Sequence, residues 1–348
     1  AAFEGFKAGV YTFRSENSSK QWATSYDFGA IKAGHVVKTE LPDGDLALAQ
    51  AYVFNLRREK FQDPLVRQAL GMMFNFEWSN EQLFYGLYDR VNSFWGNSEL
   101  EAAGVPEGHE LAVLQSIVKQ GLIDSDILTA TAVMAPVSGG RQLDRKNLRR
   151  ASALMEQAGW LVNVDGMREK DGQLFTLEVL ANSPAFDRIT NPMIENMKSL
   201  GIDARLNRVD GAQVMERSRA YDFDVMNHSM RMSLEPSSGL EQYFGTKAME
   251  GSSRNLMGFS DPAVDALIEL VVRSETKADL NIRIRVLDRV LRSKRFWIPQ
   301  WFKAVHTVAY YDQYEYPTPL PPYALGELDF WWFNAEKAAK LDDAGALN

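Results

Sequence analysis

Residues 174–226 of this chain read LFTLEVLANSPAFDRITNPMIENMKSLGIDARLNRVDGAQVMERSRAYDFDVM, and this stretch decides the fold. Strand-like apolar runs alternate in it with helical patterns: strands are predicted at 174–180, 202–209 and 221–226, and helices at 185–200 and 212–219. Strands and helices that alternate through short connections predict parallel strands joined by right-handed crossovers. The middle of the chain is therefore expected to form an α/β lobe.

Similar patterns lie on both sides of this stretch. Strands are predicted at 10–14, 51–56, 298–302 and 306–311, and helices beginning at 64, 144, 262 and 279. Pro192 interrupts the helical pattern at 185–200, which predicts either a kink or a helix that starts at Asn191. After residue 316 the chain is rich in proline and aromatic residues, a composition typical of a strap that lies on another lobe.

Length and composition exclude several classes of protein. The 348 residues suffice for about two domains. The 38 Lys and Arg residues against 46 Asp and Glu residues give a net charge of −8, and such a surface repels a phosphate backbone, so nucleic acid is not expected as a partner. The absence of cysteine excludes thiol nucleophiles, disulfides and Cys-ligated zinc.

The sequence also carries no clear signal for a membrane. The longest apolar candidate, residues 263–272, is interrupted by Asp265 and Glu269 and is too short to span a bilayer. The first nine residues have neither the basic start nor the apolar run of a secretory signal, which we expect to be absent or already removed.

Catalytic and metal-binding motifs are missing from the sequence. There is no nucleophile elbow, no phosphate-binding loop and no dinucleotide-binding glycine motif. The four histidines, at 35, 109, 228 and 306, are scattered, so no metal and no cofactor are expected. A hydrolase with dispersed carboxylates stays open as an alternative, because such carboxylate pairs leave no local signature.

The best candidate site follows the predicted strand at 221–226, because ligands bind beyond the carboxyl ends of parallel strands. The candidate residues in this segment are Asn227, His228, Met230, Arg231, Ser233 and Glu235. Arg231 is suited to a ligand carboxylate and Glu235 to an ammonium group. The alternative is a polar surface loop in which Arg231 and Glu235 pair with each other.

Two aromatic segments supply further candidates. Arg14 and Asn17 follow the aromatic strand near the start of the chain, and Trp22 comes shortly after them. Residues 75–96 are unusually aromatic and end near Trp95. This second segment predicts either a core helix followed by a packed loop or an aromatic wall for the apolar part of a ligand.

Three segments together resemble the family 5 extracytoplasmic solute-binding proteins. They are DPLVRQAL at 63–70, NLRRASALMEQAGW at 147–160 and SRNLMGFSDPAVDALI at 253–268. The opening residues 2–14, with Asn17 and Trp22, look most similar to the branch that feeds oligopeptide and microcin-type ABC importers. The resemblance extends over nearly the whole chain.

The resemblance implies a two-lobed, hinged, periplasmic-binding-protein-like α/β fold. Residues 1–60 would be part of the N-terminal lobe, 61–300 would form a nearly complete C-terminal lobe, and 301–348 would return to the N-terminal lobe. That lobe would then be partial, and we expect the chain to lack an N-terminal portion that could itself act as a partner.

The implied function is capture of a peptide between the lobes by hinge closure, and its delivery to an ABC permease in the inner membrane. The protein would lie in the periplasm or, lipid-anchored, outside the cell. Peptide binders of the family carry a Trp and an Asp soon after the strand predicted at 221–226, whereas this chain has no aspartate between Met230 and Asp261. An opine-like or other amino-acid conjugate is therefore an alternative ligand, and docking of partner chains on the aromatic segment is a third possibility.

Overall fold

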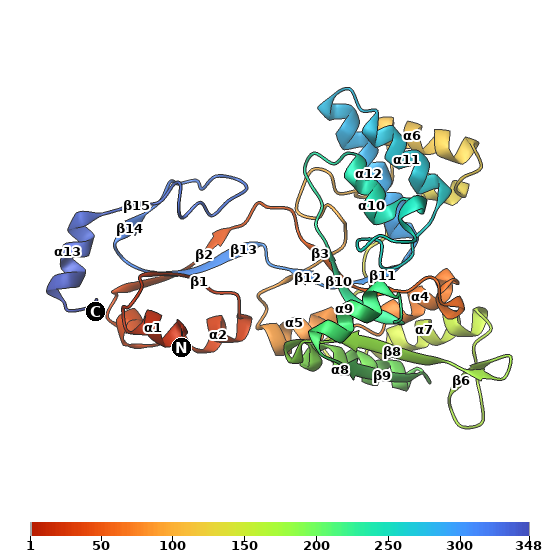
Figure 1. Ribbon diagram of the computed structural model, residues 1–348, viewed down its shortest axis with the longest axis horizontal. Coiled ribbons are helices and arrows are strands. Elements are labelled where there is room, and N and C mark those ends of the chain that lie inside the picture. Colours follow the sequence, from red (N-terminus) through yellow and green to blue (C-terminus); the bar gives the residue numbers. More distant parts are fainter. Residues whose placement is uncertain (1, 348) are drawn as a thin grey trace. The chain divides into compact units, whose positions relative to one another are not determined.

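The computed structural model describes residues 2–347, and the chain divides into two compact units (Figure 1). Unit 1 comprises Ala1–Asp45, Asn80–Asp89 and Lys303–Asn348, and unit 2 comprises Leu46–Ser79 and Arg90–Phe302. The sequence placed lobe boundaries at 60 and 300, whereas the compact units change at 45 and 302, with a short excursion at 80–89. The assignment of these units to lobes of a whole protein stays a prediction.

Unit 1 is built on a small antiparallel sheet. Strand β13, from near the end of the chain, lies between β1 and β2, and Phe13 is paired with Tyr310. Aromatic residues at the start of the chain, including Phe6 and Trp22, form the core with Tyr311. The elements of this unit are α1 (Ala2–Lys7), β1 (Phe13–Ser15), α2 (Ser19–Thr24), α3 (Gly29–Lys32), β2 (Val36–Pro42), β13 (Val305–Tyr311), β14 (Tyr314–Glu315), β15 (Trp332–Phe333) and α13 (Ala335–Asp343).

Unit 2 holds the predicted α/β lobe. Its helices are α4 (Pro64–Gly71), α6 (Gly108–Lys119), α7 (Arg145–Gln157), α8 (Pro184–Ser199), α9 (Gly211–Arg219), α10 (Glu241–Phe244), α11 (Pro262–Val272) and α12 (Lys277–Ser293), with short 3₁₀ turns η1 (Glu59–Phe61), η2 (Ser125–Leu128), η3 (Ser238–Leu240) and η4 (Thr246–Ala248). Its strands are β3 (Ala49–Phe54), β5 (Leu161–Val162), β6 (Arg168–Lys170), β7 (Gln173–Leu174), β8 (Thr176–Ala181), β9 (Asp203–Arg208), β10 (Val225–Met230), β11 (Trp297–Pro299) and β12 (Trp301–Phe302). Helix α5 (Phe76–Phe84) and strand β4 (Asp89–Arg90) lie where the chain passes between the units.

The five-stranded sheet of unit 2 has the order β11-β3-β10-β8-β9. Strands β10, β8 and β9 run parallel, with α8 and α9 as the connections, which confirms the predicted βαβ pattern. Strand β3 extends the sheet antiparallel to β10, and β11 in turn pairs antiparallel with β3, which the sequence did not predict. The carboxyl end of β8 therefore lies beside Met226, and β10 continues beyond it to Met230.

The predicted end of the third strand was wrong. Strand β10 begins at Val225 and continues to Met230, because its backbone pairs with Ala49–Phe54 of β3 over its whole length. Asn227 is paired with Tyr52 in this ladder, so it lies on a strand and not in a loop. Its polar side chain does not disturb the backbone ladder, and the tertiary pairing overrides the low strand propensity of asparagine.

Helix α8 starts before Asn191, the residue at which one of the two predicted alternatives placed its start. It begins at Pro184, with Ser183 as the N-cap residue, and it includes Pro192. A proline at the first helical position costs little, because that backbone N–H has no partner within the helix. The buried side of α8 carries Ile189, Met193 and Met197 and packs toward β9.

Helix α12 anchors the segment before Trp95 through a buried carboxylate. Asp288 Oδ1 accepts hydrogen bonds from the Ser93 hydroxyl at 2.9 Å and from the Phe94 backbone N–H at 3.0 Å. Its Oδ2 pairs with Arg292 at 3.0 Å and accepts from the Ala102 N–H at 3.0 Å. Both charged side chains are almost fully buried, so the pairing satisfies groups that water cannot reach.

Candidate functional site

A cavity of about 120 Å³, here called cavity A, lies at the carboxyl end of β8. Its lining comes from five elements of unit 2 and the turn after β8: Tyr52, Val179, Leu180, Ala181, Asn182, Ser183, Phe186, Thr190, Val214, Met226 and Asn227. Most of this surface is apolar, with a few polar groups that can fix an orientation. This is the usual composition of a small-molecule site.

The polar groups of cavity A are held by hydrogen bonds. The hydroxyls of Tyr52 and Thr190 share one at 2.7 Å. Burial raises the pKa of Tyr52 although the bond to Thr190 opposes this, so the phenol stays protonated at neutral pH. The Asn227 Nδ2 donates to Gln300 Oε1 at 2.8 Å, which joins β10 to the residue between β11 and β12.

A larger cavity of about 680 Å³, here called cavity B, adjoins cavity A. The two share Asn182 and Val214, and the remaining lining comes from α9 and the segments beside it: Gly211, Met215, Ser218, Arg219, Tyr221, Gly251, Ser252, Ser253 and Leu256. Its volume falls in the range that holds a small molecule or a few residues of peptide. We treat the two neighbouring cavities together as the candidate site, which includes the turn at the carboxyl end of β8.

Helix α9, which forms one wall of both cavities, is fixed by ion pairs. Arg217 donates to the Glu178 carboxylate at 2.7 Å and to Asp222 at 3.2 Å. Burial alone would raise the pKa of Glu178, but hydrogen bonds from Arg217 and Asn207 outweigh it and lower that pKa. The carboxylate therefore stays charged at neutral pH and ties β8 to α9.

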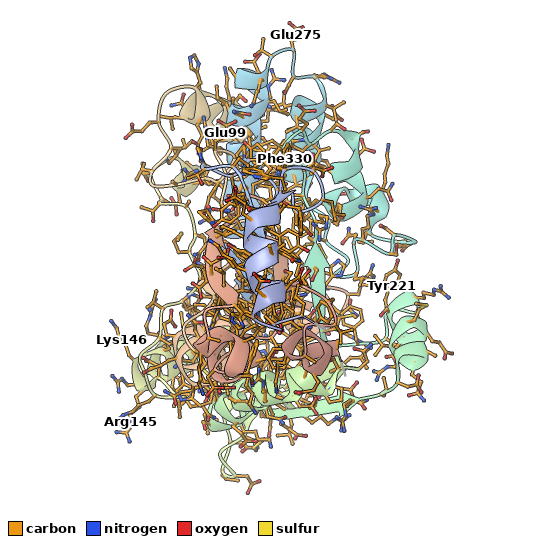
Figure 2. The ribbon with its side chains drawn as sticks, turned by 90° about the vertical axis from the view of Figure 1, so that its left-hand side faces the viewer. Glu99, Arg145, Lys146, Tyr221, Glu275 and Phe330 are labelled. Atoms are coloured by element: carbon orange, nitrogen blue, oxygen red, sulfur yellow. The ribbon has the colours of Figure 1, made fainter. Side chains whose placement is uncertain are left out.

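Tyr221 lines cavity B, and Figure 2 shows it beside α9. Its backbone has a φ of 52°, a left-handed conformation that is rare for a bulky residue. Contacts on three sides hold it there: the Arg57 guanidinium lies 3.7 Å from the ring centre, the Gly251 N–H donates to the phenol at 2.8 Å, and Asn55 donates to the backbone carbonyl at 2.8 Å. This wall of the site is thus well fixed.

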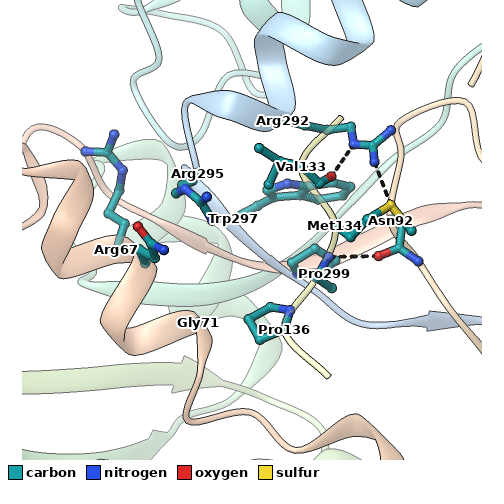
Figure 3. A pocket seen from close by; sticks show the side chains of 12 residues that line it. Arg67, Gly71, Asn92, Val133, Met134, Pro136, Arg292, Arg295, Trp297 and Pro299 are labelled. Atoms are coloured by element: carbon teal, nitrogen blue, oxygen red, sulfur yellow. Dashed lines mark hydrogen bonds between the residues drawn. The ribbon is translucent and has the colours of Figure 1, made fainter. Parts of the chain in front are cut away.

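A third cavity, near Arg292, is too small for a solute. Its volume is about 30 Å³, roughly that of one water molecule. Arg292 donates to the Val133 carbonyl at 2.7 Å and lies 3.0 Å from the sulfur of Met134 (Figure 3). Because the donors of this arginine are used internally, the cavity belongs to the packing around α12.

The comparisons with known proteins place this fold in a family. Residues 1–251 match the family described as "Bacterial extracellular solute-binding proteins, family 5 Middle". The chain belongs to this family. The resemblance seen in the three sequence segments is therefore confirmed, and the α/β fold is that of the two-lobed binding proteins.

Proteins similar to this family 5 chain are longer than it is. The chain is 40% identical over 334 residues to the "Uncharacterized protein y4wM" of Sinorhizobium fredii, covering 95% of this chain and 50% of that protein. It is 38% identical to the "Probable peptide-binding protein YejA" of Agrobacterium fabrum, covering 95% of this chain and 54% of that protein. The chain thus spans about half the length of the curated relatives it matches.

A solved structure shows the same fold. The oligopeptide-binding protein AppA of Bacillus subtilis, in complex with a nonapeptide, superposes with a TM-score of 0.68 at 17% identity, covering 95% of this chain and 58% of AppA. Relatives of the family 5 chain that carry a functional name are named as binding proteins and not as enzymes.

No helix within residues 2–347 is long and apolar enough to cross a bilayer. Over the same residues, no group of three His, Asp or Glu side chains gathers as a metal site would require.

The structure distributes the predicted site residues of this family 5 protein over several places. Asn227 lines cavity A, whereas Met230 and Trp95 are fully buried in the core of unit 2. Neither buried side chain has surface to offer a solute. Instead, the Trp95 indole N–H donates to the Ser233 carbonyl at 3.1 Å and so supports the segment that carries the other candidates.

The remaining candidates in that segment are accessible to different degrees. His228 is half-buried, and its Nε2–H donates to the Arg254 carbonyl at 3.2 Å. Burial lowers the pKa of His228 and outweighs the opposite effect of that hydrogen bond, so the ring is neutral at pH 7. Arg231, Ser233 and Glu235 are exposed after the end of β10, and no ion pair between Arg231 and Glu235 forms within the described part of the chain. Their role in binding stays a prediction.

The candidates near the start of the chain lie in unit 1 and have internal partners. Arg14 forms an ion pair with Glu16 at 2.8 Å and donates to Tyr11 at 2.9 Å. Trp22 is buried and donates from its indole nitrogen to Glu40 at 2.7 Å, while Asn17 is exposed. Internal pairing of Arg14 and Trp22 accounts for both side chains without a solute.

Sequence reasoning missed Tyr52, Phe186 and Thr190, which line cavity A. Each of these residues belongs to a strand or helix that the sequence predicted. The apolar residues near each of them in the sequence are typical of the protein core. The available signal was position: Phe186 follows the end of β8 by a few residues, at the same sheet edge that pointed to Asn227.

Proposed function

We propose that this chain is part of an extracytoplasmic solute-binding protein that captures a peptide and delivers it to an ABC permease. Membership of family 5 supports this proposal, and the peptide as ligand is suggested by the names of the YejA relative and the AppA structure. The single observation that carries it is the pair of cavities that share Asn182 and Val214 beside the carboxyl end of β8.

The geometry favours a short peptide over a small polar solute. Cavity A offers an apolar recess beside Tyr52 and Phe186, and cavity B adds a larger volume beside Met215 and Tyr221. Alternating side chains of an extended peptide can enter such recesses while backbone groups meet amides such as Asn182 and Asn227. Arg231 and Glu235 lie beyond the end of β10 as further charged contacts for the ends of the peptide.

Binding without turnover is part of the proposal. No nucleophile with an adjacent base was identified in either cavity, and the histidine closest to the site, His228, is engaged with Arg254. A solute-binding protein needs only to hold its ligand and release it to the permease. Peptides incubated with the protein are therefore expected to be recovered intact.

The proposal is tested by identifying the small molecules that co-purify with the protein. The protein is isolated under native conditions, the bound material is released with acid, and it is sequenced by mass spectrometry. The proposal expects a set of short peptides in amounts comparable to the protein. Recovery of no peptide, of an amino-acid conjugate alone, or of peptides cleaved on incubation would overturn it.

A matched pair of variants on α9 locates the binding site. Val214→Arg puts a charged side chain at the residue shared by both cavities, and Gln213→Arg puts the same side chain on the neighbouring exposed position. Val214→Arg is expected to lose most of the co-purifying peptide and Gln213→Arg to keep it. Equal recovery from both variants would remove the two cavities from the site.

A further inference from the structure

The lining of cavities A and B contains no acidic side chain among the described residues. Arg219 of α9 is the one charged residue in it, and this residue lines cavity B. The other polar groups of the lining are amides and hydroxyls, such as those of Asn182 and Ser183 just after β8. A positively charged group of a solute therefore meets no carboxylate in either cavity.

Several carboxylates neighbour this lining in the sequence, but they lie outside it. Most of them have an internal partner: Glu178 and Asp222 with Arg217, Asp224 with Lys60, Asp187 with Arg208, and Asp210 with the Gln213 N–H. The second oxygen of Asp187 has no partner but is shielded from solvent, so a solute in the cavities does not reach it. Glu216 and Glu250 are exposed, and Glu250 acts electrostatically on Arg57.

Positive charge borders the cavities instead. Arg57 lies 3.7 Å from the centre of the Tyr221 ring, so a cation already occupies one face of this aromatic side chain of the cavity B lining. Ser183, the N-cap residue of α8, lines cavity A together with Phe186 of the first helical turn, and the amino-terminal end of a helix bears partial positive charge. Together with Arg219, these groups make both cavities unfavourable for a further cation.

Cavity A has the size of one aliphatic side chain. Its volume is about 120 Å³, and a water molecule takes up about 30 Å³, so it holds about four groups of that size, as in leucine or methionine. Its wall includes Tyr52, Phe186, Val214 and the flexible thioether of Met226. An apolar side chain gains from burial there, whereas an ammonium group would lose its water without gaining a partner.

We propose that cavities A and B select a peptide segment with an uncharged, aliphatic side chain and exclude ammonium groups such as that of lysine. The aliphatic side chain enters cavity A, and the neutral amides of Asn182 and Asn227 meet the backbone of the segment. This inference rests on the proposed peptide-binding function and names the chemical class of its ligand.

The first test compares two synthetic pentapeptides by calorimetry with the wild-type protein. The probes are Ala-Ala-Met-Ala-Ala and Ala-Ala-Lys-Ala-Ala, both acetylated and amidated, so that the central side chain is the one difference. The methionine probe is expected to bind about tenfold tighter or more. The net charge of −8 attracts a cationic probe to the protein as a whole, so weaker binding of the lysine probe arises at the site. Equal affinity, or preference for lysine, overturns the inference.

The second test supplies the missing carboxylate. Val214→Asp and Val214→Asn place side chains of equal size at the residue shared by both cavities, and they differ in charge. Val214→Asp is expected to bind the lysine probe about tenfold tighter than Val214→Asn does, whereas Gln213→Asp on the neighbouring exposed position is expected to bind it as the wild type does. Equal affinity of the two Val214 variants, or an equal gain from Gln213→Asp, overturns the placement of the selectivity in these cavities.

A second pair of variants guards against misfolding of the Val214 variants. Met215 lines cavity B but is 56% exposed, so Met215→Glu and Met215→Gln are expected to keep the unfolding midpoint of the wild type. Met215→Glu is expected to bind the lysine probe more tightly than Met215→Gln does. Equal binding by this folded pair contradicts the inference in the same way.

The remaining outcomes separate the two proposals. If the wild type binds neither probe, the selectivity for aliphatic residues is overturned, and the peptide function is then judged by the co-purifying material alone. Co-purifying peptides that carry lysine as often as aliphatic residues would overturn the selectivity and leave peptide capture standing. If no peptide co-purifies and neither probe binds, both proposals fail.

Discussion

The side-chain amide of Asn227 donates to the side-chain carbonyl of Gln300 at 2.8 Å, and this bond links the lining of cavity A to the residue between β11 and β12. Asn227 lies on β10 and Gln300 comes from a segment much later in the chain, so the bond forms only in the folded protein. Gln300 is completely buried, and no water can replace the donor if it is removed.

Asn227→Leu is therefore expected to destabilise the protein by about 1–3 kcal/mol, because it leaves the Gln300 oxygen buried and unpaired. Urea unfolding measures the loss. The double variant Asn227→Leu, Gln300→Leu removes both polar partners and is expected to recover part of this stability. If the double variant loses as much stability as the two single variants lose together, the result would contradict the pairing of the two side chains.

The sequence predicted the parallel strands well because the spacing of their apolar residues and their connections are local properties of the chain. The apolar runs of β8 and β9 and the helices between them can be read from neighbouring residues alone, and the sheet edge then pointed to Asn227. The end of β10 could not be read in this way. Residues 227–229 are polar, and only pairing with β3, more than a hundred residues earlier, shows that they continue the strand.

Tyr52 and Phe186 were missed for a related reason. Each lies in a segment whose composition is typical of core, and nothing near either residue in the sequence shows that it borders a cavity. A cavity is a property of the complete three-dimensional surroundings. Arg14 has two partners that are close in sequence, Glu16 and Tyr11, and its role in binding stays a prediction.

The ion pair between Glu178 and Arg217 predicts a specific dependence of stability on pH. The pKa of Glu178 is lowered from its usual value of 4.5 in the folded protein, so its contribution is complete above pH 4.5 and is lost as the pH falls through the lowered pKa. Glu178→Gln is expected to cost about 1 kcal/mol at pH 7 and less at pH 3. Urea unfolding at both pH values measures this, and an equal difference between variant and wild type at pH 3 and pH 7 would contradict the role of the charge.

The exposed Arg231 is predicted to contact the solute. Its side chain has no hydrogen bond within the described structure, so Arg231→Ala is expected to leave the unfolding midpoint unchanged and to weaken peptide binding by about 1–3 kcal/mol. Arg273→Ala is the matched control, because that exposed arginine pairs only with Glu269 on α11. If both variants bind the co-purified peptide as tightly as the wild type does, Arg231 is not part of the site.

The buried pair of Asp288 and Arg292 is predicted to hold the Trp95 segment in place. Asp288→Asn keeps the size of the side chain but turns an NH₂ group toward donors such as the Ala102 N–H, and it leaves the Arg292 charge uncompensated. The expected loss is about 3–5 kcal/mol, as for other buried pairs that lose one partner. Glu269→Gln on the exposed side of α11 is the control and is expected to cost about 0.5 kcal/mol or less.

The effect of Asp288→Asn should also reach the segment that carries Arg231 and Ser233. Asp288 holds Ser93 and Phe94, the residues just before Trp95, and the Trp95 indole in turn donates to Ser233. Loosening this chain of contacts is expected to speed hydrogen exchange at residues 231–235 more than in the distant strands β8 and β9. Exchange that rises equally in all these segments would show that the variant loosens the whole unit and that Trp95 does not support the segment specifically.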